Sequence, residues 1–173
     1  MNIRFTDDMN PARAGKVADV LCGERLWIPT ADDYGGVNHA RWVAKTETEL
    51  AQGKRFAILA TSDGRGAGAL VWRPGDKPGQ IDLRNISITP DMRGRHLGAF
   101  CMNQFFFLAK EYVQQTEEQQ SASELLISVD TKETNLEMIT FLANLGFTVE
   151  EIRDLYGSGK NDVVMRRRVA LAV

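Results

Sequence analysis

The stretch Ile86–Gly98 reads ISITPDMRGRHLG and joins the end of a β-strand to a basic turn and the start of a helix. Ile86 and Ile88 alternate with polar residues, a pattern typical of a strand, before a proline and a glycine mark the turn. The first turn of a helix leaves its N–H groups unpaired, and their dipoles sum to roughly half a positive charge. With Arg93 and Arg95 in the turn, the segment indicates either an anion-binding site or a solvated helix cap.

The strand that leads into this turn, residues 80–89, changes the parity of its apolar face. Ile81 and Leu83 share one face, whereas Ile86 and Ile88 lie on the other if the strand is regular. One extra residue, a β-bulge, would return all four to one face and bend the strand away from its neighbour. A strand buried on both faces explains the pattern as well, so the sequence leaves both readings open.

Patterns on both sides of this segment predict further strands and helices. Strands are expected at residues 3–6, 56–61, 67–73, 80–89, 125–129, 147–152 and 162–169, and helices at 10–23, 39–52, 97–114 and 134–145. This order predicts a mixed α/β fold with a central sheet, antiparallel in its hairpins and flanked by helices.

The longest predicted helix, residues 97–114, carries an apolar stripe at helical spacing. The stripe consists of Leu97, Phe100, Cys101, Phe105, Leu108 and Tyr112. We expect it to pack in the core together with the Phe105–Phe107 triplet, which makes Cys101 a core residue rather than a nucleophile.

Composition limits the classes of function. The 173 residues correspond to a single domain, residues 1–173. Lysine and arginine total 21 against 23 acidic residues, and the net charge of −2 disfavours wholesale binding of nucleic acid or an anionic membrane. Arg166–Arg168 alternate across a predicted strand, so we expect them at a solvated sheet edge rather than in a nucleic-acid patch.

Targeting and metal-binding patterns are absent from the sequence. Cys22 and Cys101 form no CxxC motif, and no paired histidine spacing accompanies them, so neither a zinc site nor a disulfide framework is predicted. The apolar runs are far shorter than the ~20 residues that cross a bilayer, and the first residues lack the apolar core of a signal peptide. We therefore expect a cytoplasmic protein without a metal.

Two blocks of the chain resemble the GNAT N-acetyltransferase superfamily. The acetyl-CoA signature Arg/Gln-x-x-Gly-x-Gly/Ala corresponds to Arg93–Gly98, after the strand end Ile86–Pro90. The block Asn-x-x-Ala, followed by Leu-Tyr-x-x-x-Gly-Phe, corresponds to Asn135–Met138 and Phe141–Phe147. The predicted elements match the family order over essentially the whole chain. The resemblance implies a GNAT-like, mostly antiparallel sheet with a bulge and a splay between its fourth and fifth strands.

The resemblance also implies acetyl-CoA as the cosubstrate. In the family, amides of the turn hold the pyrophosphate, the strand end offers main-chain groups to the pantetheine arm, and the asparagine of the second block contacts the cofactor near that arm. The cofactor-binding residues implied in this chain are Ile86, Ile88, Arg93, Gly94, Arg95, His96, Leu97, Gly98 and Asn135.

The implied reaction is direct transfer of the acetyl group to a primary amine, because no nucleophile for a covalent intermediate presents itself. Such a transfer needs a base for the ammonium and a donor for the developing oxyanion. Asp82 lies near the family position of a Glu or Asp base; the alternative is a surface aspartate paired with Arg84. The expected oxyanion donor is the Ile88 backbone N–H.

Two positions depart from the family pattern. His96 stands where glycine is preferred, so its side chain limits the approach of the pyrophosphate unless the imidazole turns outward or itself contacts a phosphate. Leu142 stands where a tyrosine usually protonates the leaving thiolate. Since a thiol pKa lies near 8.5, loss of that acid should slow an enzyme rather than necessarily abolish its activity. The alternative is a catalytically weak or inactive acyl-CoA-binding module that acts through protein contacts.

The sequence leaves the acceptor open among small amines, antibiotics, protein N-termini, lysines and aminoacyl-tRNA, because all would leave the same cofactor signature. Asp32, Asp33 and Tyr34 in a predicted loop could contact a cationic amine, and Tyr34 or Tyr156 could replace the missing acid. Fold relatives often pair through their C-terminal strands, so the resemblance allows a homodimer.

Overall fold

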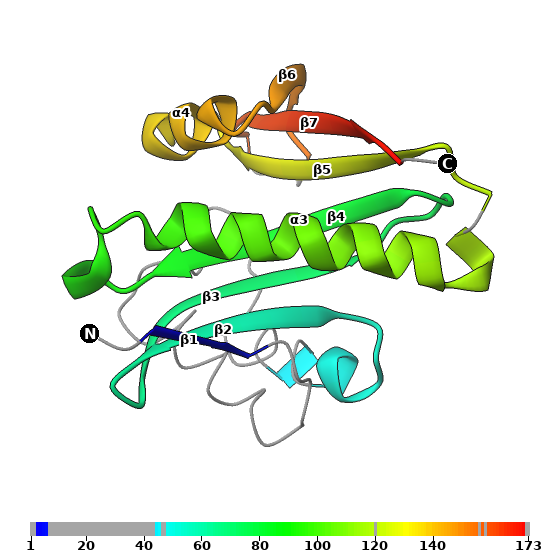
Figure 1. The fold of residues 1–173 in the computed structure, drawn as a ribbon. Helices are drawn as coiled ribbons and strands as arrows, with labels where there is room; N and C mark the ends of the chain where they lie inside the picture. The colour runs from blue at the N-terminus through cyan, green and yellow to red at the C-terminus, as the bar shows by residue number, and fades with distance from the viewer. Residues whose placement is uncertain are drawn as a thin grey trace.

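A computed structural model gives the architecture of the chain (Figure 1). The structure describes residues 3–6, 44–45, 48–119, 121–155, 157 and 159–171. Within these residues seven strands form one sheet, in the order β1-β2-β3-β4-β5-β7-β6. The strands are β1 (Ile3–Thr6), β2 (Phe56–Ser62), β3 (Arg65–Pro74), β4 (Gln80–Ile88), β5 (Glu124–Lys132), β6 (Thr148–Arg153) and β7 (Asp162–Ala170).

All neighbouring strands are antiparallel except β4 and β5, which are parallel. The helices are α3 (Leu97–Gln115) and α4 (Leu136–Asn144), with short 3₁₀ turns η1 (Pro90–Met92) and η2 (Glu117–Gln119). In Figure 1, α3 runs along β4 on one face of the sheet, and α4 lies near its first turn. The predicted mixed α/β fold with a mostly antiparallel sheet is confirmed.

The predictions for the N-terminal part fall largely outside the described residues. Residues 44–45 and 48–51 are helical, within the helix expected at 39–52. The helix expected at 10–23 and the loop with Asp32, Asp33 and Tyr34 lie outside the described residues, as do Cys22 and Tyr156. In the part that the structure does describe, no helix is long and apolar enough to span a membrane.

The parity change in β4 is caused by a bulge. In the pairing with β3, Val71 lies opposite Asn85 but Trp72 lies opposite Leu83, which leaves Arg84 as the extra residue. The parallel pairing with β5 also ends at Leu83. β4 therefore leaves its partner where the bulge begins, and the predicted splay between the fourth and fifth strands of the fold is confirmed.

The core lies between the sheet and α3. The buried residues of α3 are Leu97, Cys101, Met102, Phe105, Ala109 and Val113. Burial raises the pKa of Cys101 to about 12, so its thiol stays protonated, as a core residue should.

Two aromatic side chains that were expected in the core lie at the surface. Phe100 is 53% exposed and Phe107 is 58% exposed. A helix turns about 100° per residue, so Phe107 lies on the far side from Phe105, and Phe100 is a quarter turn away from Cys101. A helix that packs on one face of a sheet buries only one such stripe.

The arginines of β7 lie where the pairing of this strand with β6 ends. β7 pairs with β5 on one side and β6 on the other, so it is an inner strand. Arg168 and Arg166 donate hydrogen bonds to Glu150, which lower the pKa of Glu150 to about 2. Arg167 lies on the other face, with its guanidinium 4.3 Å from the centre of the Phe106 ring. The pairing with β6 ends at Arg166, so Arg167 and Arg168 have a register partner only on β5. The charges divide between two faces as expected.

The turn from β4 into α3 holds two residues in the left-handed region. Gly94 has φ +70° and His96, the residue before the helix, has φ +59°. A side chain in this conformation costs roughly 1–2 kcal/mol, which explains why the family pattern has glycine at the position of His96. The chain keeps the turn despite this cost.

The strain at position 96 can be measured. Because glycine adopts the left-handed conformation without a steric penalty, His96→Gly is expected to be about 1 kcal/mol more stable to unfolding than His96→Ala, which removes the imidazole but keeps a Cβ. Urea denaturation of the two variants measures the difference. Equal midpoints would show that this backbone conformation carries no strain.

Candidate active site

A pocket of about 560 Å³ opens where β4 ends and α3 begins. Three segments line it: the end of β4, the turn with the first residues of α3, and one face of α4. The lining residues are Ile86–Ile88, Met92–Gly94, His96–Ala99, Asn135, Glu137, Met138, Phe141, Asn144 and Leu145.

The strand end presents its main chain to this pocket. Ile88 lies opposite Gly68 of β3, and the amide of the next residue, Thr89, bonds to the carbonyl of Ala67. This arrangement marks a non-hydrogen-bonded pair, in which the N–H and C=O of Ile88 point away from β3. Ile86, two residues earlier, has the same orientation. Both face the side of β5, with which β4 has ceased to pair.

The turn adds further donors. The amides of Leu97, Gly98 and Ala99 belong to the first turn of α3 and have no partner within the helix, and His96 supplies no side-chain cap. Arg93 is tied to the strand end, since its Nε donates to the Ile88 carbonyl at 3.2 Å. Main-chain donors, a helix dipole and one guanidinium thus converge on the same opening, which suits a phosphate group.

The start of α3 packs closely against the aromatic ring of α4 at Gly98. A Cβ built there would lie 3.4 Å from Cζ of Phe141 and 3.8 Å from Cγ1 of Ile88, which is ordinary van der Waals contact. The Phe141 ring therefore closes one side of the pocket.

The asparagine of the second block holds α4 in place. Asn135 caps the helix by accepting a hydrogen bond from the Met138 amide at 3.3 Å, and its Nδ2 donates to Oγ1 of Thr131 at 3.2 Å. It also lines the pocket. Its side chain links α4 to β5, so Asn135 has a structural role in the fold.

Sequence reasoning missed the wall that α4 contributes. Met138, Phe141 and Leu145 line the pocket beside Asn135. Their spacing of three and four residues from one another follows one helix face, and this signal was available in the sequence. Ser87 on β4 was missed as well, because its place at the pocket follows from the splay.

Two residues singled out from the sequence lie away from the pocket lining. Arg95 is exposed and does not line the pocket, unlike Arg93. Leu142 is fully buried and belongs to the core cluster. The position at which the family has its tyrosine is therefore filled by core packing in this chain.

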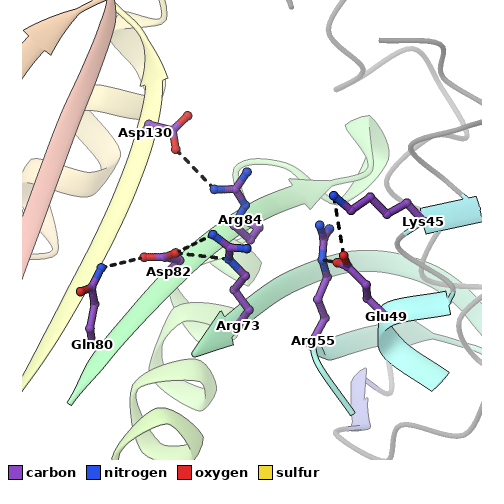
Figure 2. Close-up of polar contacts among 8 residues, drawn as sticks. All are labelled: Lys45, Glu49, Arg55, Arg73, Gln80, Asp82, Arg84 and Asp130. Atoms are coloured by element: carbon purple, nitrogen blue, oxygen red, sulfur yellow. Dashed lines mark hydrogen bonds and ion pairs between the residues drawn. The ribbon is translucent and has the colours of Figure 1, made fainter. Parts of the chain in front are cut away.

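Asp82 lies on the outer face of the sheet, away from α3 (Figure 2). Ile81 and Leu83 on either side of it belong to the core, so its own side chain points the other way. Its Oδ2 accepts hydrogen bonds from Nε and Nη2 of Arg73, both at 3.2 Å, and Nε2 of Gln80 donates to Oδ1 at 3.3 Å.

The expected alternative partner of Asp82 is not the observed one. Arg84 lies 3.9 Å from Asp130 of β5, whereas Arg73 pairs with Asp82 because the two are register partners across β3 and β4. In the part of the chain that the structure describes, no group of three or more His, Cys, Asp and Glu residues could hold a metal ion.

Comparisons with known proteins show which solved structures share this fold. No family model matches the chain, and no curated protein matches it. Solved structures do match. The ribosomal-protein-S18-alanine N-acetyltransferase from Escherichia coli is 14% identical, with a TM-score of 0.69 over 99% of this chain and 97% of that one.

Two further structures agree. The PaiA N-acetyltransferase from Thermoplasma acidophilum, solved in complex with coenzyme A, is 13% identical, with a TM-score of 0.68 over 98% of this chain and all of that one. An acetyltransferase of the GNAT family from Streptococcus pneumoniae is 14% identical, with a TM-score of 0.65 over 98% of this chain and all of that one. The chain has the fold of the GNAT N-acetyltransferases.

Proposed function

We propose that the protein is an acetyl-CoA-dependent N-acetyltransferase that transfers the acetyl group directly to a primary amine. The observation that carries this proposal is the pocket at the splay. There the outward-facing main chain of Ile86 and Ile88 meets the unpaired amides at the start of α3. A long ligand with a diphosphate at one end and an amide-containing arm at the other fits such a row of donors and acceptors.

The residues of the pocket divide the binding of acetyl-CoA between them. The amides of Gly94 to Ala99, with Arg93 beside them, bind the pyrophosphate. The main chain of Ile86 and Ile88 forms hydrogen bonds with the pantetheine arm, in the place that β5 would otherwise occupy. The apolar wall formed by Met138 and Phe141 excludes water from the arm.

Acetyl-CoA supplies the activated acetyl group as a thioester. The amine nitrogen forms a bond to the carbonyl carbon, the carbon–sulfur bond breaks, and coenzyme A leaves as a thiolate or thiol. The Ile88 N–H, which points into the splay, stabilises the charge that develops on the carbonyl oxygen. Asp82, directly or through water, accepts the proton of the ammonium on the outer face.

Fold likeness supports the cofactor assignment. The Thermoplasma acidophilum protein of the same fold binds coenzyme A, and the Escherichia coli protein acetylates the alanine of ribosomal protein S18. A common fold does not transfer a substrate from one chain to another. For this chain, the pocket geometry supports coenzyme A as the cosubstrate.

A second candidate function is binding of acyl-CoA without efficient catalysis. The observation in its favour is Leu142, which is buried in the core at the position of the family tyrosine and cannot protonate a thiolate. Thermal stabilisation by coenzyme A without acetylation of any amine in a broad panel would favour this function.

The first prediction of the proposal concerns the phosphate site. Replacing Arg93 by glutamate removes a guanidinium from the turn and places an anion there. We expect the dissociation constant for coenzyme A, measured by calorimetry, to rise at least about tenfold, because a charge-assisted hydrogen bond contributes roughly 1.5–3 kcal/mol. The control is Arg153→Glu, since Arg153 lies on β6 and is not among the pocket-lining residues. Unchanged affinity in Arg93→Glu would place the cofactor elsewhere.

The second prediction concerns the base. Asp82→Asn keeps the shape of the side chain but removes its ability to take a proton. We expect kcat to fall by about 100-fold or more, while the affinity for coenzyme A stays unchanged, because Asp82 does not line the pocket. Asp76→Asn, in the exposed turn between β3 and β4, is the matched control. If Asp82→Asn lost stability but kept full turnover, Asp82 would have only a structural role, through its ion pair with Arg73, and would not be the base.

A further inference from the structure

Three ion pairs lie together on the outer face of the sheet, where the proposed base is also found (Figure 2). Each joins one arginine to one acid, and they extend from the start of β2 to the splay. The pairs are Arg55–Glu49, Arg73–Asp82 and Arg84–Asp130. This face is opposite the one covered by α3, so a ligand here would approach the splay from the side away from that helix.

The pair Arg84–Asp130 stands at the mouth of the splay. Arg84 is the bulge residue of β4, and Asp130 directly follows Val129, the last residue of β5 that pairs with β4. Nη1 of Arg84 and Oδ1 of Asp130 are 3.9 Å apart, which is longer than a hydrogen bond. Their side chains are 32% and 22% exposed. A polar ligand can therefore reach both groups without displacing a tight hydrogen bond between them.

The positive charges of Arg73 and Arg84 also act on Arg55. Burial is the largest cause that lowers the pKa of Arg55, the nearby carboxylate of Glu49 opposes it, and the positive charges of Arg84 and Arg73 lower the pKa further. Arg55 is thus close enough to Arg73 and Arg84 for their repulsion to act on it. An anion bound among them would relieve this repulsion, whereas a ligand with only positive charge would increase it.

We propose that this face binds the acceptor, and that the acceptor is a primary amine carrying a carboxylate, with the carboxylate on Arg84 and the amine toward Asp130 and Asp82. The inference rests on the proposed function, and the bonds made and broken are those given there. Guanidinium groups match the planar geometry of a carboxylate and can bind it through two parallel hydrogen bonds. The two aspartates favour the ammonium form on arrival, before the proton is lost.

The test compares acceptors that differ only in charge. β-Alanine and 4-aminobutyrate are each paired with the matching carboxamide, and kcat/KM is measured from release of the coenzyme A thiol. We expect each carboxylate to be preferred about tenfold or more, the size expected for one charge-assisted contact. Arg84→Gln should remove this preference by lowering kcat/KM for the carboxylate, with little change for the carboxamide. Arg84→Lys should restore part of it, and Arg153→Gln on β6 should retain all of it.

Binding gives a second readout that does not depend on turnover. The same compounds are titrated into protein saturated with coenzyme A, and their binding is followed by ligand-observed NMR. Selective binding of the carboxylates that Arg84→Gln abolishes supports the inference, with or without turnover. Equal binding and use of both members of a pair, a preference for the carboxamide, or a preference that survives Arg84→Gln overturns it and leaves the proposed function standing. Failure to bind coenzyme A at all would overturn the proposed function and the acceptor role together.

Discussion

The extra residue at Arg84 is the constraint on which the site depends. Because Arg84 has no partner on β3, β4 changes direction there, and its pairing with β5 ends at Leu83. Buried backbone groups normally find hydrogen-bond partners within the protein. Past the bulge, the Ile88 carbonyl accepts a hydrogen bond from Nε of Arg93, and the main chain of Ile86 and Ile88 otherwise faces a pocket. The sheet thus lacks part of the hydrogen-bond ladder between β4 and β5. A ligand with amide groups can pair with β4 where β5 no longer does.

Around the same bulge, apolar side chains lie on one face of the sheet and charged side chains lie on the other. On the α3 side, Ile86 returns to the core face with Ile81 and Leu83, so the pocket is closed by apolar side chains next to main-chain donors. On the other side, the side chains are charged, with Arg84 and Asp130 at the splay. A cofactor and an acceptor can then reach one point from opposite directions without competing for the same surface. This arrangement suits direct transfer in a ternary complex, which requires both ligands to be present at once.

Local patterns in the sequence predicted the positions of most helices and strands. They did not predict which distant strands and side chains pair with one another. The Asp63–Gly64 dipeptide is typical of a hairpin turn, and both residues have the left-handed backbone that a tight hairpin requires. The parity change in β4 allowed either a bulge or a strand buried on both faces, and only the register with β3 decides for the bulge. That register also pairs Asp82 with Arg73 instead of Arg84. The inner position of β7 and the exposure of Phe107 likewise depend on which surfaces meet, and a single sequence does not encode this in any local pattern.

The two departures from the family motif carry different weight. At position 96 the turn needs an amide and a left-handed backbone, and His96 supplies both at a cost in strain. At position 142 the family needs a hydroxyl group, and Leu142 cannot supply one from the core. A site built from main-chain groups therefore tolerates the substitution at position 96 better than acid catalysis would tolerate the substitution at position 142. Recognition by main-chain groups constrains the path of the backbone far more than the identity of the side chains, which is consistent with a fold shared at 13–14% identity with proteins that no family model links to this chain.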